Sequence, residues 1–296
     1  ILQSRPDLSR VFNAATPVRI LPGDSTTERW ASLGTGVRTD AHGVRAIEGV
    51  RFRGGDHVLQ RISRGDFVLM RVAPLLGVAR REPLPPTVRR RDYVWEIVAA
   101  RGLPSVAVNW WASADARAGA LQSIGPESVF AAAQGDALRV DTLAASRFLA
   151  SLDAQPRLAT VYLPALDVVL NRLELDQSTR LAQSLRALDG LTRTVAEVRA
   201  RGYEVVLAGM PGDGQRGAAV IASTLPLQRA SSEFDVAPTL LDLLGFPLSN
   251  EMPGRSLASP SGEPRIASYG NRTVSGDSPQ VNDDYYKNLK SLGYIR

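Results

Sequence analysis

A strand–helix–strand pattern between Val161 and Gly217 constrains the fold of this chain more than any other stretch. It opens with the apolar run V-Y-L-P-A-L-D-V-V-L-N and closes with E-V-V-L-A-G-M-P-G-D-G-Q-R-G. Between these runs, leucine and valine recur at spacings of three and four over residues 177–201, which predicts an amphipathic helix. Two buried strands joined by a crossover helix are typical of an open α/β sheet, which binds its ligands where the strands end.

Apolar strands and amphipathic helices alternate along the rest of the chain. This alternation predicts an α/β fold with a mainly parallel central sheet and helices on both faces, as a single domain over residues 1–296. Residues 45–90 are rich in Gly, Arg and Pro and predict a small inserted excursion. The expected helices cover residues 7–14, 93–101, 128–135, 141–153, 177–201, 235–245 and the last residues of the chain. The expected strands or extended segments cover residues 17–21, 106–110, 159–163, 204–207 and 218–222.

Composition excludes several classes of site and partner. The 296 residues include no cysteine, which excludes disulfides, zinc–thiolate sites and cysteine nucleophiles. The net charge of +5 comes almost entirely from arginine, and because the arginines are scattered except at Arg89–Arg91, we expect no nucleic-acid partner. No apolar run is long enough to cross a membrane, so membrane association is expected only through a segment outside this chain. The chain begins at Ile1 without a signal-peptide pattern, so a first strand or an anchor would lie upstream.

Four stretches carry a resemblance to a known family. They are W-A-S-L-G-T-G-V-R-T-D-A-H-G at 30–43, V-W-E-I-V-A-A-R-G-L-P-S-V-A-V-N-W-W-A-S at 94–113, V-Y-L-P-A-L-D at 161–167, and F-D-V-A-P-T-L-L-D-L-L-G-F-P-L-S-N-E-M-P-G-R-S-L at 234–257. With these stretches in this order, the chain resembles the alkaline phosphatase superfamily, in particular its type I phosphodiesterase/nucleotide pyrophosphatase-like branch. The resemblance implies an alkaline phosphatase-like fold.

The resemblance also implies a hydroxyl nucleophile and two divalent metals, usually zinc, held by Asp and His side chains. The nucleophile position falls on Thr26, nine residues before Thr35 of the T-G pair, or on Thr27 if the register shifts by one. The alternative role for Thr26 is that of a helix cap.

Most of the metal ligands that the family uses are replaced in this chain. The family's D-x-x-x-H falls on Asp167 and Asn171, and an Asn amide binds zinc more weakly than an imidazole does. The family's S-D-H-G falls on 208–211, A-G-M-P, which contains neither ligand, and its last His falls on Asp213. Asp167 is also typical of a helix N-cap, and Asp213, within P-G-D-G, is typical of a turn.

The chain has two histidines, and neither falls on a ligand position. His42 corresponds to the H-G that follows the T-G pair, which resembles a structural position, and His57 lies in the excursion, where we expect a surface residue. The family's first metal-binding Asp would lie at the end of the first strand, upstream of Leu8, and we expect this ligand to be either absent or lost to truncation.

These replacements predict a catalytically degenerate phosphodiesterase/phosphatase-like protein that acts as a binding, scaffolding or regulatory subunit, with protein partners and no cofactor. The alternative is an active metal-dependent phosphoric ester hydrolase in which Thr26 is the nucleophile and carboxylates such as Asp167 and Asp213 hold Zn²⁺, Mn²⁺ or Mg²⁺. A third possibility is a small-molecule binder in which Trp110 and Trp111 stack on a phosphate-bearing ligand, although a Trp at a strand end is more often a core residue. The resemblance favours a periplasmic or membrane-associated bacterial protein.

Overall fold

The computed structural model describes residues 10–12, 14–18, 25–55, 58–60, 72–212, 219–259, 264–273 and 283–295. Helices and strands alternate along most of this length, so the α/β class is confirmed. The helices are α2 (Thr26–Thr35), α3 (Thr39–His42), α5 (Val94–Ala100), α6 (Pro126–Ala133), α7 (Ala137–Ser151), α8 (Ala165–Asp167), α9 (Gln177–Ala200), α10 (Val236–Leu243) and α11 (Asp283–Ser291). Within this part of the chain, none of them is both long and apolar enough to span a membrane.

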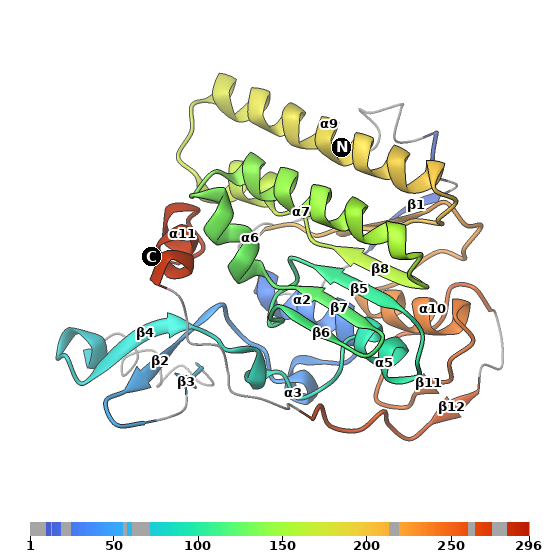
Figure 1. Ribbon diagram of the computed structural model, residues 1–296, viewed down its shortest axis with the longest axis horizontal. Coiled ribbons are helices and arrows are strands. Elements are labelled where there is room, and N and C mark those ends of the chain that lie inside the picture. The colour runs from blue at the N-terminus through green and yellow to red at the C-terminus, as the bar shows by residue number, and fades with distance from the viewer. Residues whose placement is uncertain are drawn as a thin grey trace.

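A four-stranded sheet forms the centre of the molecule. Its strands follow the order β6 (Ala116–Ala118), β7 (Leu121–Ile124), β5 (Ser105–Val108) and β8 (Leu158–Val161). Strand β5 pairs in parallel with both β7 and β8, and β6 adds an antiparallel edge. Every residue of β5 is buried, because α5 and α7 pack against the sheet from opposite sides (Figure 1).

A second, three-stranded sheet is antiparallel throughout. It places β10 (Ala219–Ser223) between β1 (Ala14–Val18) and β9 (Val206–Gly209). Strands β9 and β10 are joined by residues 210–218, a connection too short for a crossover helix, and short connections favour antiparallel pairing. The described strand pairs therefore do not show the mainly parallel sheet that we expected from the sequence.

The first described residues also differ from the expected structure. The sequence predicts a helix over residues 7–14, but residues 10 and 11 form a turn and β1 begins at Ala14. Among the described strands, β1 pairs only with β10, and such an edge position tolerates Pro17, which has no backbone N–H to donate.

A small antiparallel sheet falls inside the predicted excursion. Strand β2 (Glu48–Phe52) pairs with β3 (Val58–Leu59) on one side and with β4 (Ala79–Pro83) on the other. This lobe has its own apolar cluster of Val50, Ala73 and Ala79, and it lies at one end of the molecule, beside the main sheets and helices (Figure 1). A last pair, β11 (Leu248–Ser249) and β12 (Arg265–Ile266), is parallel.

The main core is rich in aromatic rings. Tyr93, Trp95 and Trp110 contact one another through their rings, with centroids 4.4–6.3 Å apart. The C-terminal helix α11 packs against α6 and contributes the fully buried Leu289, and Leu292, directly after the helix, is also fully buried. Segments from both halves of the chain thus share one core.

Candidate functional site

The N-terminus of α2 carries the predicted nucleophile. Ser25 is the N-cap residue: its Oγ accepts from Glu28 N at 3.2 Å, and Glu28 Oε2 accepts from Ser25 N at 2.7 Å. This reciprocal capping box starts the helix. Thr26 is the first helical residue and is buried, as is Thr27. The cap that we considered for Thr26 is therefore formed by Ser25.

Asp167 lies in a widened helical turn beyond the end of β8. Helix α8 continues into a π-helical turn, Val168–Arg172, and turns of this kind are frequent at functional sites. Arg172 Nε lies 2.7 Å from Asp167 Oδ2, and Asn171 Nδ2 donates to Asp167 Oδ1 at 3.0 Å. Both carboxylate oxygens are therefore engaged by neighbouring side chains, and the Asp167 side chain makes no N-cap hydrogen bond.

The loop after β9 lies directly against this turn. A Cβ atom added to Gly212 would stand 2.6 Å from Asp167 Oδ1 and 2.3 Å from Asn171 Nδ2, so any other residue here would displace these two side chains. The carbonyl of Pro211 accepts a hydrogen bond from Arg29 Nη1 of α2 at 3.2 Å. The structure thus brings together three segments that the sequence singled out: α2, the Asp167 turn and the loop after β9. Asp213 and His57 lie outside the described residues.

Two arginines complete this constellation, and sequence reasoning did not find them. Arg29 lies one turn after Thr26 and is 4% exposed, and its Nε has no hydrogen-bond partner among the described residues. The Arg172 side chain is 7% exposed, and its guanidinium stacks on the Tyr294 ring, 4.1 Å from the ring centroid. Arg172 is therefore a buried cation beside the Asp167 carboxylate, while Arg29 bonds to the loop that lies against it.

A comparison with protein-family models gives a match over residues 13–209, to type I phosphodiesterase / nucleotide pyrophosphatase. This chain belongs to that family. The match covers the first three of the four resembling stretches, and the fourth, at 234–257, lies beyond it. No curated protein matches the chain.

The described donor set does not fit the two divalent metals that the phosphodiesterase family implies. Asp167 is already paired with Arg172, and Asn171 turns its amide nitrogen, a donor, toward the same carboxylate. The loop residues Gly209–Gly212 offer no carboxylate or imidazole. No group of three or more His, Asp or Glu side chains that could hold a metal ion occurs within the described ranges. We derive no catalytic step through a metal at this site.

Trp110 and Trp111 support the site from within the core. Both are buried; Trp110 contacts Trp30 and Trp111 contacts Tyr294, with ring centroids 5.6 and 5.1 Å apart. Asn109, in a left-handed conformation, donates to Tyr162 O at 2.8 Å and links the ends of β5 and β8. These contacts place both tryptophans among protein rings, and stacking on a bound ligand stays a prediction.

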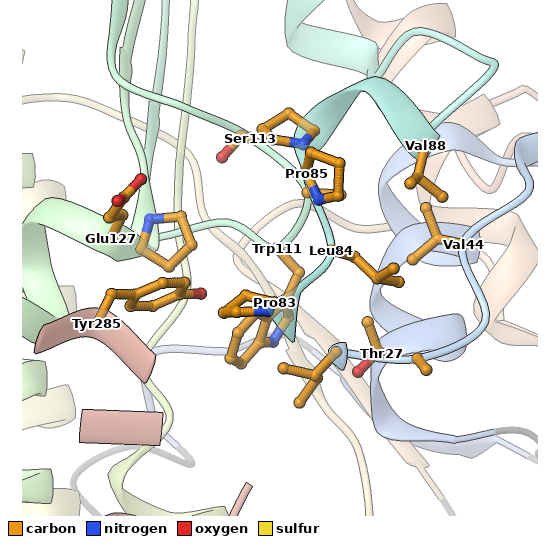
Figure 2. A pocket seen from close by; sticks show the side chains of 15 residues that line it. Thr27, Val44, Pro83, Leu84, Pro85, Val88, Trp111, Ser113, Glu127 and Tyr285 are labelled. Carbon is orange, nitrogen blue, oxygen red and sulfur yellow. The ribbon is translucent and has the colours of Figure 1, made fainter. Parts of the chain in front are cut away.

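A cavity next to α2 is too small for a nucleotide. It holds about 40 Å³, and Figure 2 shows Thr27, Trp111, Glu127 and Tyr285 around it. One water needs roughly 10–15 Å³ on such a measure, so the cavity has room for a few water molecules.

His42 occupies a buried structural position. Val44 N donates to His42 Nδ1 at 3.1 Å, so the proton lies on Nε2, which is 3.0 Å from Ser32 Oγ. Burial lowers the pKa of His42 to about 3, with the nearby charges of Arg89 and Arg45 acting in the same direction. The imidazole is therefore neutral and holds the α2–α3 region together.

Two arginines of the run at 89–91, Arg89 and Arg91, are also structural. The Arg89 guanidinium is fully buried and binds both oxygens of Glu96 at 2.6 Å, while its plane lies 3.8 Å from the Tyr93 ring centroid. Arg91 pairs with Glu251 at 2.7 Å. These two charges are used within the protein rather than presented to a phosphate backbone.

Proposed function

We propose that this chain is a catalytically inactive member of the type I phosphodiesterase/nucleotide pyrophosphatase family that acts as a binding, scaffolding or regulatory subunit. The observation that carries the proposal is the engagement of both Asp167 oxygens, one by Arg172 and one by Asn171. A guanidinium supplies positive charge at the retained carboxylate, but it offers no open coordination position for a reacting oxygen. The partners would be proteins, with no nucleic acid and no cofactor.

The alternative is an active phosphodiesterase or phosphatase with Thr26 as the nucleophile and a carboxylate-rich site. Its support is the family itself, together with the position of Thr26 at the start of a helix that bonds to the loop after β9. The parallel strands β7, β5 and β8 support the family's mainly parallel central sheet, which stays a prediction. A periplasmic or membrane-associated location likewise stays a proposal from family likeness.

Metal content and turnover separate the two functions. The protein is incubated with Zn²⁺, Mn²⁺ and Mg²⁺ and desalted, its metal content is measured by mass spectrometry, and its hydrolysis of bis-p-nitrophenyl phosphate is followed. We expect no stoichiometric metal and only background hydrolysis. The test variant is Thr26→Ala, and the control is Thr142→Ala on α7, whose hydroxyl bonds to Leu138 O far from the site in sequence.

Equal background rates in the wild type and in both variants support the inactive role. Metal-dependent turnover that Thr26→Ala loses and Thr142→Ala keeps would overturn it and establish the hydrolase.

A further inference from the structure

Exposed apolar side chains gather on the small β2–β3–β4 lobe. Of the nine large apolar side chains that are exposed in the described part of the chain, five belong to this lobe. They are Leu59, Val72, Leu75, Leu76 and Val78. Leu75 and Leu76 are the most exposed, at 86% and 70%. Solvent exposure of adjacent leucines is unfavourable, so this surface calls for an explanation.

The local fold turns these two leucines outward. Ala73, within the helical turn at residues 72–75, is buried in the lobe's own apolar cluster and anchors the turn. Leu76 N donates to Val72 O at 3.0 Å, and Gly77, with φ of 69°, ends the turn before β4. The turn lies at the outer end of the lobe, away from the main body (Figure 1). The leucines therefore form a projecting apolar tip.

Arginines line a cavity beside the tip. Arg51, Arg53 and Arg80 surround a space of about 480 Å³ together with Gly77, the residue that follows Leu76. Arg53 N donates to Val78 O at 3.0 Å, so the arginine-bearing turn adjoins the leucine-bearing one. Arg51 and Arg80 both bind the carboxylate of Glu82. Two of the three guanidinium groups thus share one carboxylate, which leaves the described surface next to the leucines positive.

We propose that this lobe binds the surface of a bilayer that contains anionic phospholipids. Leu75 and Leu76 enter the boundary of the acyl chains, and the cavity lined by Arg51, Arg53 and Arg80 receives phosphate groups. Guanidinium groups match phosphate oxygens in geometry, and neighbouring apolar and basic side chains are typical of interfacial binding. The inference goes beyond the proposed inactive role and differs from the expectation that only a segment outside this chain meets a membrane.

The shape of the tip favours a bilayer over a protein partner. A stable protein interface buries roughly 800 Å² on each partner and spreads over a matched surface. Two leucines at the apex of a tight turn offer a convex point instead, which a fluid interface accepts without a preformed pocket. The charge complementarity of three arginines with anionic headgroups points to the same occupant.

Vesicle sedimentation of the full chain tests this inference. We expect binding to mixed phosphatidylcholine–phosphatidylglycerol vesicles, little binding to phosphatidylcholine alone, and release at high salt because the arginine component is screened. Leu75→Ser with Leu76→Ser should lower partitioning by roughly a hundredfold, since each buried leucine contributes a factor of about ten. Arg53→Ser with Arg80→Ser should weaken binding and remove most of its salt dependence.

The matched control is Leu181→Ser with Leu185→Ser, which changes two leucines on α9 that are 61% and 46% exposed. This control should bind vesicles as the wild type does, and thermal unfolding checks that all variants are folded. Absence of binding, equal binding to both vesicle types, or loss of binding in the α9 control would each overturn the proposal. Concentration-dependent self-association that disappears in the Leu75/Leu76 variant would also overturn it, because the tip would then be an interface between copies.

Discussion

The ion pair between Asp167 and Arg172 engages the carboxylate that the family resemblance predicts at a metal-binding position. Both side chains are almost buried, so removing one partner leaves a charge that neither water nor protein fully compensates. We expect Arg172→Met to lower the free energy of unfolding by about 2–3 kcal/mol, and Asp167→Asn in the same chain to restore part of that loss. Urea unfolding of the single and double variants measures this coupling.

An exposed ion pair provides the control for these variants of Arg172 and Asp167. Arg201 and Asp153 lie 2.8 Å apart, with side chains 35% and 78% exposed, so Arg201→Met should cost about 1 kcal/mol or less. Equal losses for Arg172→Met and Arg201→Met would show that the Asp167 carboxylate does not depend on Arg172.

The buried His42 makes the stability of the protein depend on pH. Its pKa is about 3 in the folded protein, against 6.5 for an ordinary histidine, because burial favours the neutral ring. Between these values the unfolded chain binds more protons, so stability falls as the pH decreases below about 6.5. His42→Asn keeps an oxygen acceptor for Val44 N but does not titrate.

We therefore expect His42→Asn to be less stable than the wild type at neutral pH, but to lose less stability on acidification. Urea unfolding at a series of pH values between about 6.5 and 4 measures both slopes. Parallel pH profiles for the two proteins would contradict the assignment of this acid sensitivity to His42.

At the scale of elements, helix α9 shows what periodicity predicts and what it leaves open. The three-and-four spacing correctly predicted a helix, which runs from Gln177 to Ala200. The same stripe includes Leu185, which is 46% exposed, and Leu188, which is 7% exposed, because only part of the helix packs on the protein. Spacing fixes the face of a helix, but the length of its packed contact depends on the neighbouring elements.

The contrast between these leucines is testable. Leu188→Ala should lower the free energy of unfolding by about 2–4 kcal/mol, since it leaves a cavity under α9. Leu185→Ala, with the same change on the solvent side, should cost less than about 1 kcal/mol. Chemical denaturation of both variants provides the comparison, and similar losses would place α9 in a different register.

The sequence predicted which segments form the candidate site but not the contacts that join them. The family resemblance assigned Asp167 and residues 208–211 to one site, and in the structure the neighbouring Gly212 lies against Asp167. The ion pair with Arg172 depends on a π-helical turn, and the hydrogen bond from Arg29 to Pro211 O joins segments far apart in the sequence. The antiparallel pairing of β9 with β10 likewise depends on their short connection, because apolar runs by themselves do not specify the direction of a strand.

At the scale of the whole molecule, the C-terminal segment connects α6 to the candidate site. Helix α11 packs on α6, and the residues after it bring the Tyr294 ring onto the Arg172 guanidinium. Gly293 adopts φ of 72°, and a Cβ atom there would lie 2.9 Å from Arg172 O. The end of the chain therefore closes directly over the turn that holds Asp167.

Alanine substitutions at two glycines with similar backbone conformations distinguish the cost of this close approach from the cost of the left-handed conformation. Gly102 has φ of 80° and no atom within 4 Å of an added Cβ. Gly102→Ala should therefore lower the free energy of unfolding by about 1–2 kcal/mol, because alanine is strained in the left-handed conformation. Gly293→Ala should cost about 1 kcal/mol more, because the methyl group must also displace the Arg172 backbone. Thermal or urea unfolding of both variants measures the difference. If Gly293→Ala were no more costly than Gly102→Ala, the C-terminal segment would not press on the Asp167 turn, and the turn would have to hold its ion pair without that support.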